Sequence, residues 1–539
     1  MYSNIRNSKG GGVSIGTVMG LLAQATDRAP NKTALIDGNE SITYRDLFEK
    51  VNQISEYLIS LSMPRESRVV IYSNKSIDQV VAILSVLSTS YIVVPISNLL
   101  KEEQVKYILD DCNVECVITD KYKIDSIKSI KFEKQIVSLD SNESNVISFK
   151  EIYKYNSKVA SKRTISSNSS ASIIYSSGST GFPKGIVSSH KNLFDGAKIV
   201  SSYLGLQESD NISGVLSFNF DYGLNQIYCS INMNATLILH SYFLPINFYK
   251  HLIDGNITVL PLMPVFLSRI FNKKMIKGID ASLLLSVRII CSSGGRVTQR
   301  MLNGVDQYFK KSIFFSMYGL TEAFRSTFLD PSQIQIRPTS IGKAIPDVEL
   351  YIINENGNEC QANEVGELIH RGGCIGKGYW NRHKETKKRY KSINILNNIL
   401  NIKGQLNDEL VVCSGDYAYK DGEGYIYFVS RKDDMIKSSG YRISPDEIEG
   451  SIYQNIKEIR ECAVFSVEDE GIGEKIIMAF TADNILDVSD IQFVLKKHLP
   501  SHMIPKTIFK LEVMPTTTAN QGKINKKVIK LMYEQGEYQ

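Results

Sequence analysis

The stretch from Ser176 to Gly185 combines residue types that bind phosphate groups. It reads Ser-Ser-Gly-Ser-Thr-Gly-Phe-Pro-Lys-Gly, so three glycines, four hydroxyl side chains and one lysine fall within ten residues. Glycines let the backbone approach a polyphosphate closely, Ser and Thr supply hydroxyl donors, and Lys184 adds a positive charge. The pattern therefore predicts a cradle for a polyphosphate.

The position of Lys184 excludes the common Walker phosphate loop. A Walker loop needs Gly-Lys followed by Ser or Thr at the start of a helix, whereas Lys184 lies between Pro183 and Gly185. Pro183 has no backbone N–H and biases Phe182 away from helical geometry, which indicates an extended, mobile loop. The alternative is a Gly/Ser surface linker, which the apolar, strand-like run Ala171–Tyr175 just before the loop disfavours.

Length and composition indicate an ordinary globular protein, with 43% hydrophobic and 22% charged residues. Its 539 residues exceed what one hydrophobic core usually holds, so at least two domains are expected. A net charge of +5 is weak for this size and does not indicate nucleic-acid binding; the short cluster Lys387–Arg389 indicates a solvated face. No apolar stretch reaches transmembrane length and the N-terminus opens no signal peptide, so we expect a cytoplasmic protein that does not bind membranes.

The cysteines do not form a zinc motif. Of the eight, only Cys112 and Cys116 lie close together, without the histidine or second cysteine pair that a zinc site requires. We expect the cysteines to be buried, reduced thiols.

Apolar β-branched runs alternate with helical patterns through the first several hundred residues. The sequence predicts strands at Arg68–Tyr72, Tyr91–Pro95 and Cys116–Thr119, and helices at Ile77–Leu87 and Glu102–Cys112. This alternation predicts an α/β fold whose parallel strands are buried under helices.

The pattern changes in the second half of the chain. From about residue 330 to 378 short strands and turns dominate, as in Val348–Ile353 followed by Asn-Glu-Asn-Gly, a hairpin signature. After Arg431 a small unit of helices and strands begins, and the charged, glycine-terminated run Arg431–Gly440 suits a domain hinge. We therefore expect a large N-terminal domain, residues 1–430, with α/β subdomains and a β-rich subdomain, and a small mobile C-terminal domain, residues 431–539.

Further segments concentrate polar residues that a structural role would not require: Tyr318–Glu322, Ser414–Asp416, Arg431–Asp434 with Gly440–Arg442, and Asn520–Lys523. With the phosphate loop, their order and spacing resemble the core motifs of the adenylate-forming superfamily, which includes acyl-CoA synthetases, luciferase and the adenylation domains of nonribosomal peptide synthesis. Accessory motifs of that superfamily match at Thr43–Leu47, Gly366–Leu368 and Gly376–Tyr379. The resemblance covers nearly the whole chain, and five collinear motifs make it specific.

The resemblance implies that ATP and Mg²⁺ activate a carboxylic acid. A carboxylate that attacks the α-phosphate meets an anion, so the site must neutralise charge and hold the reactants in line. The residues implied to be catalytic are Lys523, Thr180, Lys184 and Glu322, with Glu322 also holding Mg²⁺. The residues implied to bind ATP are Ser176, Ser177, Gly178, Ser179, Thr180, Gly181, Lys184, Gly294, Gly295, Arg296, Tyr318, Gly319, Thr321, Asp416 and Arg431.

Several of these residues have a specific role by the resemblance. Tyr318 would stack on adenine, the backbone around Gly294–Arg296 would border the base, and Thr321 would contact a phosphate. Asp416 would accept both ribose hydroxyls, since a carboxylate has two acceptor oxygens. Arg431 would reach the ribose or the α-phosphate.

The resemblance also implies two orientations of the small domain, one for adenylation and one for thioester formation. Lys523 would be delivered to the carboxylate and α-phosphate in the first. After rotation about Asp433, Gly440 would take its place and leave space for a pantetheine arm.

The predicted acyl pocket begins at Ser217–Asn225 and departs from a generic acyl-CoA synthetase. Fatty and aryl acid synthetases often carry a histidine or an aromatic residue followed by an apolar residue there, whereas this chain has Phe220 and Asp221. The pair resembles that of amino-acid-activating adenylation domains, in which the aspartate pairs with the substrate ammonium. A carboxylate in an apolar pocket costs several kcal/mol unless it is paired. The alternative is an aspartate that caps a local turn before Gly223.

Ser293 and Arg325 also map onto the pocket lining, as does Gly319, and they indicate a second carboxylate on the substrate. The combination of Asp221, Ser293 and Arg325 is similar to stand-alone adenylation enzymes of macrolactam pathways, which activate β-amino acids such as 3-methylaspartate. Asp221 would bind the amine, Ser293 and Arg325 the α-carboxylate, and the β-carboxylate would become the acyl-AMP. For Arg325, an internal salt bridge or solvent exposure is the alternative.

The sixteen residues after Lys523 leave no room for a carrier domain. We therefore expect the acyl acceptor to be the phosphopantetheine of a separate acyl or peptidyl carrier protein, or coenzyme A. Two other functions stay open: an acyl-CoA ligase for a fatty or small organic acid, which Asp221 opposes, and a prolyl-carrier-protein ligase, which leaves Arg325 unexplained. The sequence does not choose between the α- and the β-carboxylate.

Overall fold

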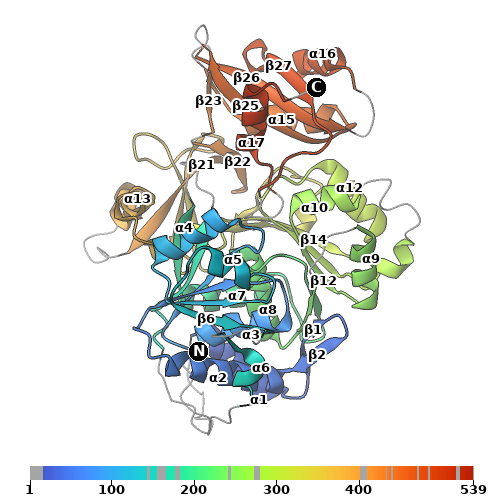
Figure 1. The fold of residues 1–539 in the computed structure, drawn as a ribbon. Coiled ribbons are helices and arrows are strands. Elements are labelled where there is room, and N and C mark those ends of the chain that lie inside the picture. Colours follow the sequence, from blue (N-terminus) through green and yellow to red (C-terminus); the bar gives the residue numbers. More distant parts are fainter. Residues whose placement is uncertain are drawn as a thin grey trace. The chain divides into compact units, whose positions relative to one another are not determined.

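The computed structural model describes residues 16–141, 146–154, 165–176, 183–240, 245–271, 280–400, 409–432, 434–438, 441–469, 473–482, 486–517 and 523–537 (Figure 1). The chain forms two compact units. The first comprises Met1–Phe243 and Gly373–His383, and the second comprises Leu244–Gly372 and Lys384–Gln539. The expected domain boundary near residue 431 stays a prediction.

The first unit contains an eight-stranded sheet in the order β19-β9-β8-β4-β3-β5-β6-β7. The strands from β8 to β7 along this order run parallel, and β9 and β19 are antiparallel to their neighbours. Their bounds are β3 (Arg68–Tyr72), β4 (Ile92–Pro95), β5 (Cys116–Thr119), β6 (Gln135–Ser138), β7 (Ile147–Ser148), β8 (Ser170–Ser176), β9 (Lys184–Ser189) and β19 (Gly378–Tyr379).

A second group of strands in the first unit is formed by β10 (Asn211–Gly214), β11 (Thr236–Leu239), β1 (Thr33–Asp37) and β2 (Glu40–Thr43). The pairs β10–β11 and β11–β1 are parallel, and β1–β2 is antiparallel. The helices of this unit are α1 (Val18–Arg28), α2 (Tyr44–Ser60), α3 (Ile77–Leu87), α4 (Glu102–Cys112), α5 (Ile124–Ser129), α6 (Phe149–Ile152), α7 (His190–Tyr203) and α8 (Asp221–Met233).

Local sequence accounts for these elements. The Ser76 side chain accepts a hydrogen bond from the Gln79 backbone N–H and so caps α3. Most residues of α3 are apolar and all but one are buried, because the helix packs under other elements on nearly every side. The predicted helices Ile77–Leu87 and Glu102–Cys112 and the predicted parallel strands are confirmed, β4 beginning one residue later than expected.

The second unit begins with β12 (Val259–Leu262), β13 (Ile289–Ser292), β14 (Ile313–Tyr318), β15 (Thr327–Leu329) and β16 (Lys343–Ala344). Strands β12, β13 and β14 are parallel, and β15 and β16 continue the row in antiparallel order. The accompanying helices are α9 (Pro245–Asp254), α10 (Pro264–Ile270) and α12 (Gln299–Tyr308).

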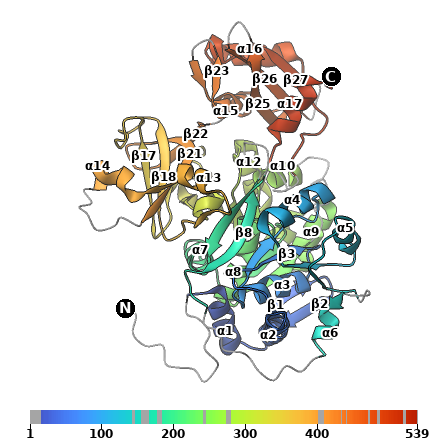
Figure 2. The ribbon, with the colours of Figure 1, turned by 60° about the vertical axis from the view of Figure 1, so that its left-hand side comes forward.

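An antiparallel sheet follows, with the order β17-β18-β21-β20 and with β22 paired to β21; β17, β18 and β21 are drawn as neighbours in Figure 2. The predicted hairpin after Val348–Ile353 is confirmed by a bridge between Ile353 and Glu359. The bounds are β17 (Val348–Ile353), β18 (Gly366–Gly372), α13 (His383–Arg389), β20 (Tyr390–Ser392), α14 (Asn397–Leu400), β21 (Leu410–Lys420) and β22 (Ile426–Arg431).

The last part of the chain is the expected α+β arrangement. Its sheet has the order β24-β23-β26-β25, with β27 parallel to β26. A core of apolar side chains that includes Ile448, Ile452, Met478 and Phe480 lies between the sheet and its helices. The bounds are β23 (Ile436–Ser438), β24 (Tyr441–Ile443), α15 (Pro445–Asn455), β25 (Ile459–Asp469), β26 (Gly473–Ala482), α16 (Val488–His498), β27 (Thr507–Lys510) and α17 (Lys526–Glu534).

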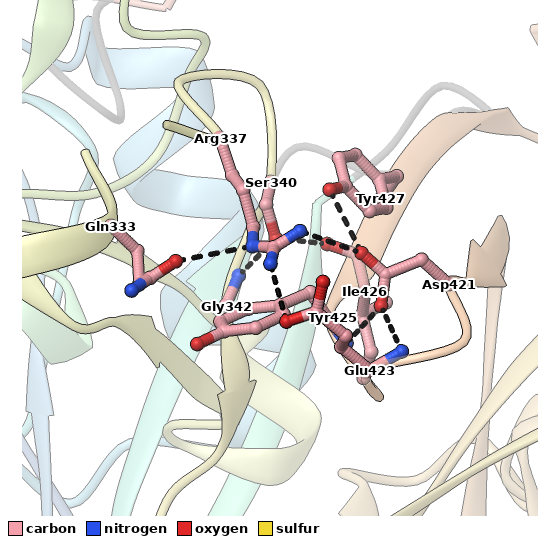
Figure 3. Close-up of polar contacts among 9 residues, drawn as sticks. All are labelled: Gln333, Arg337, Ser340, Gly342, Asp421, Glu423, Tyr425, Ile426 and Tyr427. Atoms are coloured by element: carbon pink, nitrogen blue, oxygen red, sulfur yellow. Dashed lines mark hydrogen bonds and ion pairs between the residues drawn. The ribbon is translucent and has the colours of Figure 1, made fainter. Parts of the chain in front are cut away.

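Arg337 holds the turn between β21 and β22 (Figure 3). Its guanidinium donates to Gln333 Oε1 at 3.1 Å, lies 3.4 Å from Asp421 Oδ2, and packs 4.4 Å from the centre of the Tyr425 ring. The Asp421 Oδ1 atom accepts hydrogen bonds from the turn's own N–H groups, including that of Tyr425 at 2.9 Å. Arg337 thus links the turn to the segment that follows β15.

Among the described residues, no helix is both long enough and apolar enough to cross a membrane. The eight cysteines are free thiols, as expected. Cys360 and Cys413 are only partly buried, whereas the other six are buried.

Candidate functional site

Three residues from separate sequence motifs meet at one carboxylate in the second unit. Asp416 on β21 lies opposite Arg431 on β22, and the Arg431 Nε atom is 3.5 Å from Asp416 Oδ1. Tyr318, the last residue of β14, donates its hydroxyl hydrogen bond to Asp416 Oδ2. Asp416 is only 4% exposed, and burial raises the pKa of its carboxyl, while Arg431 and Tyr318 lower it. The structure thus brings these three predicted residues together; their roles toward adenine and ribose stay predictions.

His370 is a member of this cluster that sequence reasoning missed. Its ring stacks with that of Tyr318, with the two ring centres 6.2 Å apart. Burial lowers the pKa of His370 to about 3, so the ring is neutral, and neither ring nitrogen has a hydrogen-bond partner within the described part of the chain. The sequence could have identified His370 as buried, because the alternation of side chains along β18 places it on the same face as Leu368.

Arg389 corrects the expectation of a solvated basic cluster at Lys387–Arg389. Lys387 and Lys388 are exposed, but Arg389 packs against Gly415, where an added Cβ would come 2.1 Å from its Nη1 atom. Its charge also lowers the pKa of Asp416. Local sequence could not reveal this contact, because Arg389 and Gly415 meet only when β20 and β21 pair.

The segment from Tyr318 to Ser326 turns back on itself. Phe324 has φ 54° and ψ −53°, and the Arg325 N–H donates to the Ala323 carbonyl at 2.6 Å, which defines a γ-turn of the rare positive-φ type. Such a backbone costs about 1–3 kcal/mol and is found mainly at functional sites. The Ser326 N–H then donates to the Tyr318 carbonyl at 3.2 Å and closes the loop.

This loop buries Arg325 and presents the predicted Mg²⁺ ligand. Arg325 is 3% exposed, and Gly319 is needed beside it because an added Cβ would come 3.2 Å from the Arg325 Cα. Thr321 and Glu322 lie in a short 3-10 turn, and the Glu322 carbonyl accepts a hydrogen bond from the Tyr390 hydroxyl at 3.5 Å. The alternative that Arg325 is exposed to solvent is therefore wrong.

The donor set around Glu322 fits a metal that arrives with a nucleotide. Within the described residues, no three His, Cys, Asp or Glu side chains gather closely enough to hold a metal ion by themselves. Mg²⁺ is commonly bound by one or two carboxylates together with substrate phosphates. A single carboxylate such as that of Glu322 is sufficient for that arrangement.

Gly294, Gly295 and Lys523 also belong to the second unit. Gly294 has φ 87°, and an added Cβ there would lie 3.7 Å from the Lys523 Cε atom. The Arg296 guanidinium donates to the Asp446 carbonyl at 2.6 Å. Ser293 is buried beside these glycines, with 4% exposure. The expected hinge residues Asp433 and Gly440 lie outside the described residues.

The ends of the phosphate loop belong to the first unit. Ser176 on β8 lies opposite Lys184 on β9 in an antiparallel pair, and the Lys184 ammonium is 5.7 Å from the centre of the Tyr379 ring. The other predicted loop residues lie outside the described residues: Ser177, Gly178, Ser179, Thr180 and Gly181.

Side chains of α4 hold both ends of the loop. The Tyr107 hydroxyl donates to the Pro183 carbonyl at 3.1 Å, and the Tyr175 hydroxyl donates to Asp111 Oδ2 at 2.6 Å. Arg382 joins the two contacts, because its guanidinium donates to the Tyr107 hydroxyl oxygen and pairs with Asp111. The loop is therefore attached to a rigid helix at its entrance and at its exit.

The predicted pocket segment also lies in the first unit. Phe220 precedes α8, and Asp221 is its first residue, where a negative charge is favourable. The Asp221 Oδ1 atom accepts a hydrogen bond from the Tyr222 N–H at 2.8 Å, so the local capping alternative holds for one of its oxygens. Asn225 lies one helical turn later on the same face and is fully buried, with neither amide atom hydrogen-bonded among the described residues. The i, i+4 spacing from Asp221 could have identified Asn225.

Comparison with known proteins identifies the family of this site. Residues 22–380 match the AMP-binding enzyme family. The chain belongs to that family. The expected cofactors ATP and Mg²⁺ are thereby confirmed, and a solved structure of o-succinylbenzoate coenzyme A synthetase from Bacillus subtilis contains both.

Curated relatives of this AMP-binding enzyme include gramicidin S synthase 1 from Brevibacillus brevis. The two are 26% identical over 516 residues, which is 95% of this chain and 44% of that protein. Surfactin synthase subunit 2 from Bacillus subtilis (strain 168) is 26% identical over 522 residues, which is 95% of this chain and 14% of that protein. The chain thus spans less than half the length of these relatives.

Solved structures confirm the predicted adenylate-forming fold. The anthranilate CoA ligase in complex with anthranoyl-AMP has a TM-score of 0.83 at 22% identity, covering 96% of both chains. ATP-bound MatB from Rhodopseudomonas palustris has a TM-score of 0.84 at 21% identity, covering 96% of this chain and 99% of that chain. At such identities the likeness concerns the fold alone.

We predict that Tyr107→Phe weakens ATP binding without unfolding the protein. The change removes the hydrogen bond to the Pro183 carbonyl, which contributes about 0.5–1.5 kcal/mol, and also the one that Arg382 donates to the hydroxyl, so the Kd for ATP should rise at least about two- to tenfold in titration calorimetry. Tyr122→Phe is the matched control, since Tyr122 is 71% exposed. An unchanged Kd for ATP in Tyr107→Phe would show that this attachment does not shape the nucleotide site.

Proposed function

We propose that this AMP-binding enzyme activates an amino acid as its aminoacyl-AMP with release of pyrophosphate, and passes the acyl group to the phosphopantetheine thiol of a separate carrier protein. The substrate is an acidic or β-amino acid, such as aspartate or 3-methylaspartate, used in natural-product biosynthesis. The enzyme is thus an AMP-forming acid-thiol ligase.

The observation that carries this proposal is the burial of Arg325 directly after the Tyr318–Glu322 motif. A guanidinium has five N–H donors in a planar fork, so a buried one can bind a carboxylate in addition to its contacts within the protein. The γ-turn at Phe324 fixes the backbone direction at Arg325 and joins it to the segment assigned to ATP and Mg²⁺. The positive charge of Arg325 suits a second carboxylate on the substrate, in addition to the carboxylate that reacts with ATP.

The first turn of α8 supports an amine on the same acid. One Asp221 oxygen accepts the Tyr222 N–H, and an ionised carboxylate has capacity for several donors, a substrate ammonium among them. The buried amide of Asn225 offers both a donor and an acceptor one turn later. A substrate with polar groups of both kinds fits this face better than a fatty acid does, because an aliphatic chain would leave these groups unpaired.

In the proposed first reaction, an oxygen of the substrate carboxylate attacks the α-phosphorus of ATP. A bond forms between that oxygen and the phosphorus, and the bond to the oxygen that bridges to the β-phosphate breaks, so pyrophosphate leaves with the electron pair. Lys184 and Lys523 supply positive charge toward the phosphates and the reacting carboxylate. Mg²⁺ held by Glu322 would neutralise further phosphate charge when bound.

In the proposed second reaction, the thiol sulfur attacks the acyl carbon of the adenylate. A thioester forms, AMP leaves as the anion, and the thiol proton passes to solvent or to AMP. Lys523 has no part in this step, which suits the expected exchange of Lys523 for Gly440 between two orientations of the small domain.

The proposal predicts which acids support ATP–pyrophosphate exchange. Aspartate, 3-methylaspartate, glutamate, proline, β-alanine and octanoate should be compared at equal concentration. We expect the fastest exchange with aspartate or 3-methylaspartate, because each carries an amine and two carboxylates on a short chain. Exchange with octanoate but with no amino acid would overturn the proposal in favour of an acyl-CoA ligase, and exchange with proline alone would favour an imino-acid substrate.

Arg325→Ala should weaken an acidic substrate by more than about tenfold in kcat/KM, because a charged hydrogen bond is worth about 1.5–3 kcal/mol. The KM for ATP should stay close to that of the parent protein. Arg65→Ala is the matched control, since Arg65 is exposed in the first unit. Equal kinetics for the acid in Arg325→Ala and the parent would remove Arg325 from the site.

Lys523→Ala should abolish adenylation and spare thioester formation from a chemically prepared acyl-adenylate. The reason is that the lysine charge is needed only while phosphate charge develops. Lys527→Ala is the control, because Lys527 is exposed on α17. Equal loss of both half-reactions in Lys523→Ala would contradict the two-orientation mechanism.

A further inference from the structure

Lys75 is a charged residue that none of the motifs explains. It lies between β3 and α3, directly before the capping residue Ser76. Its ammonium donates hydrogen bonds to three backbone carbonyls, those of Gly214, of Leu216 at 2.8 Å and of His240 at 3.1 Å. An ammonium has three N–H donors, so these three acceptors match its full capacity.

Two of the three carbonyls lie where neighbouring strands end, and the third lies in the connection that follows the first of them. Gly214 is the last residue of β10, and His240 directly follows β11. Leu216 lies in the segment 215–220, which connects β10 to Asp221 at the start of α8. The same segment passes over the Lys75 ammonium, which is 4.9 Å from the centre of the Phe218 ring. One lysine thus binds both the strand ends and the connection that leads to Asp221.

The segment is also fixed from the side of α8. A Cβ added to Gly223 would come 1.7 Å from the Ser217 carbonyl oxygen, so the first turn of α8 packs directly on the segment. A shift of residues 215–220 would therefore move the first turn of the helix with it. The direction of the Asp221 carboxylate depends on where this segment lies.

The Lys75 ammonium is buried, and burial disfavours a charge unless polar groups surround it. Burial lowers the pKa of Lys75 to about 7, and the carboxylate of Asp37 opposes this change. Asp37 ends β1, and burial raises the pKa of its carboxyl. The Lys75 side chain exchanges hydration for the three carbonyls, which would otherwise lack their donor.

We propose that Lys75 is a positioning residue for substrate recognition, in which its ammonium holds residues 214–220 so that the Asp221 carboxylate faces the amine of the acid. The inference rests on the proposed function, in which Asp221 binds that amine. Lys75 acts through backbone atoms and does not touch the substrate.

The test compares Lys75→Met and Lys75→Arg with the parent in pyrophosphate exchange. Methionine keeps the length of the side chain and removes the donors, whereas arginine keeps the charge and the donors. We expect Lys75→Met to raise the KM for aspartate at least tenfold and to leave the KM for ATP within twofold, with partial recovery in Lys75→Arg. Lys121→Met, an exposed lysine of the same unit, is the control.

Two further measurements separate positioning from general destabilisation. The parent should prefer aspartate over succinate, which lacks the amine, and Lys75→Met should reduce this preference together with the affinity. In Asp221→Asn, adding Lys75→Met should cost much less than it does in the parent, because residues that act as a unit are not additive. Thermal unfolding of each variant identifies any that fail to fold, and Lys75→Arg then carries the comparison.

The outcomes distinguish this inference from the proposed function. Exchange with an amino acid together with an unchanged aspartate KM in Lys75→Met, or fully additive effects in the double variant, would overturn the role of Lys75. Equal loss for aspartate, succinate and ATP would also overturn it, because the lysine would then serve the fold as a whole. Absence of exchange with every amino acid in the parent would instead remove the proposed function.

Discussion

A carboxylate with almost no access to water organises the second unit. Burying the Asp416 side chain costs free energy unless charged or polar donors surround it. Tyr318 provides one donor from the end of β14, and Arg431 provides another from the end of β22. The requirement to pair one buried charge therefore brings the ends of β14 and β22 to the interior of β21, and β14 belongs to a different sheet from the other two. At the turn of the β21–β22 hairpin, Arg337 makes a second set of polar contacts with the strand pair that carries Asp416.

In the first unit the groups that need partners are backbone carbonyls, and a buried ammonium supplies the donors. Where β10 and β11 end, backbone carbonyls point away from the sheet and need donors. Lys75 supplies them from a neighbouring connection. The phosphate loop is held by the hydroxyl of Tyr107 on α4 in a comparable way, again through a backbone carbonyl. In both places a side chain holds the backbone of a connecting segment through a carbonyl oxygen.

The sequence predicted the repetitive part of this protein well. Helices Ile77–Leu87 and Glu102–Cys112 were predictable to the residue because periodic apolar side chains and polar boundaries mark them locally. The conjunction of Tyr318, Asp416 and Arg431 was predictable only through the resemblance, since nearly a hundred residues separate Tyr318 from Asp416. Arg389 was misjudged because a basic cluster looks solvated until β20 and β21 pair. His370 and Asn225 were missed because burial of a polar side chain depends on tertiary packing. Their spacing from Leu368 on β18 and from Asp221 on α8 nevertheless placed each of them on a predictable face.

The turn at Phe324 has a consequence for how such a site can change. The backbone itself sets the direction in which residue 325 points, through the hydrogen bond from its N–H to Ala323 and the closure from Ser326 to Tyr318. Both of these hydrogen bonds are made by backbone atoms. A different amino acid there would occupy the same backbone position next to the Tyr318–Glu322 motif, while Tyr318, Glu322 and Asp416 kept their geometry. Under the proposed function, in which Arg325 binds the acid, acid selectivity could therefore change at one position while the nucleotide motif stayed the same, although both lie in a single loop of nine residues from 318 to 326.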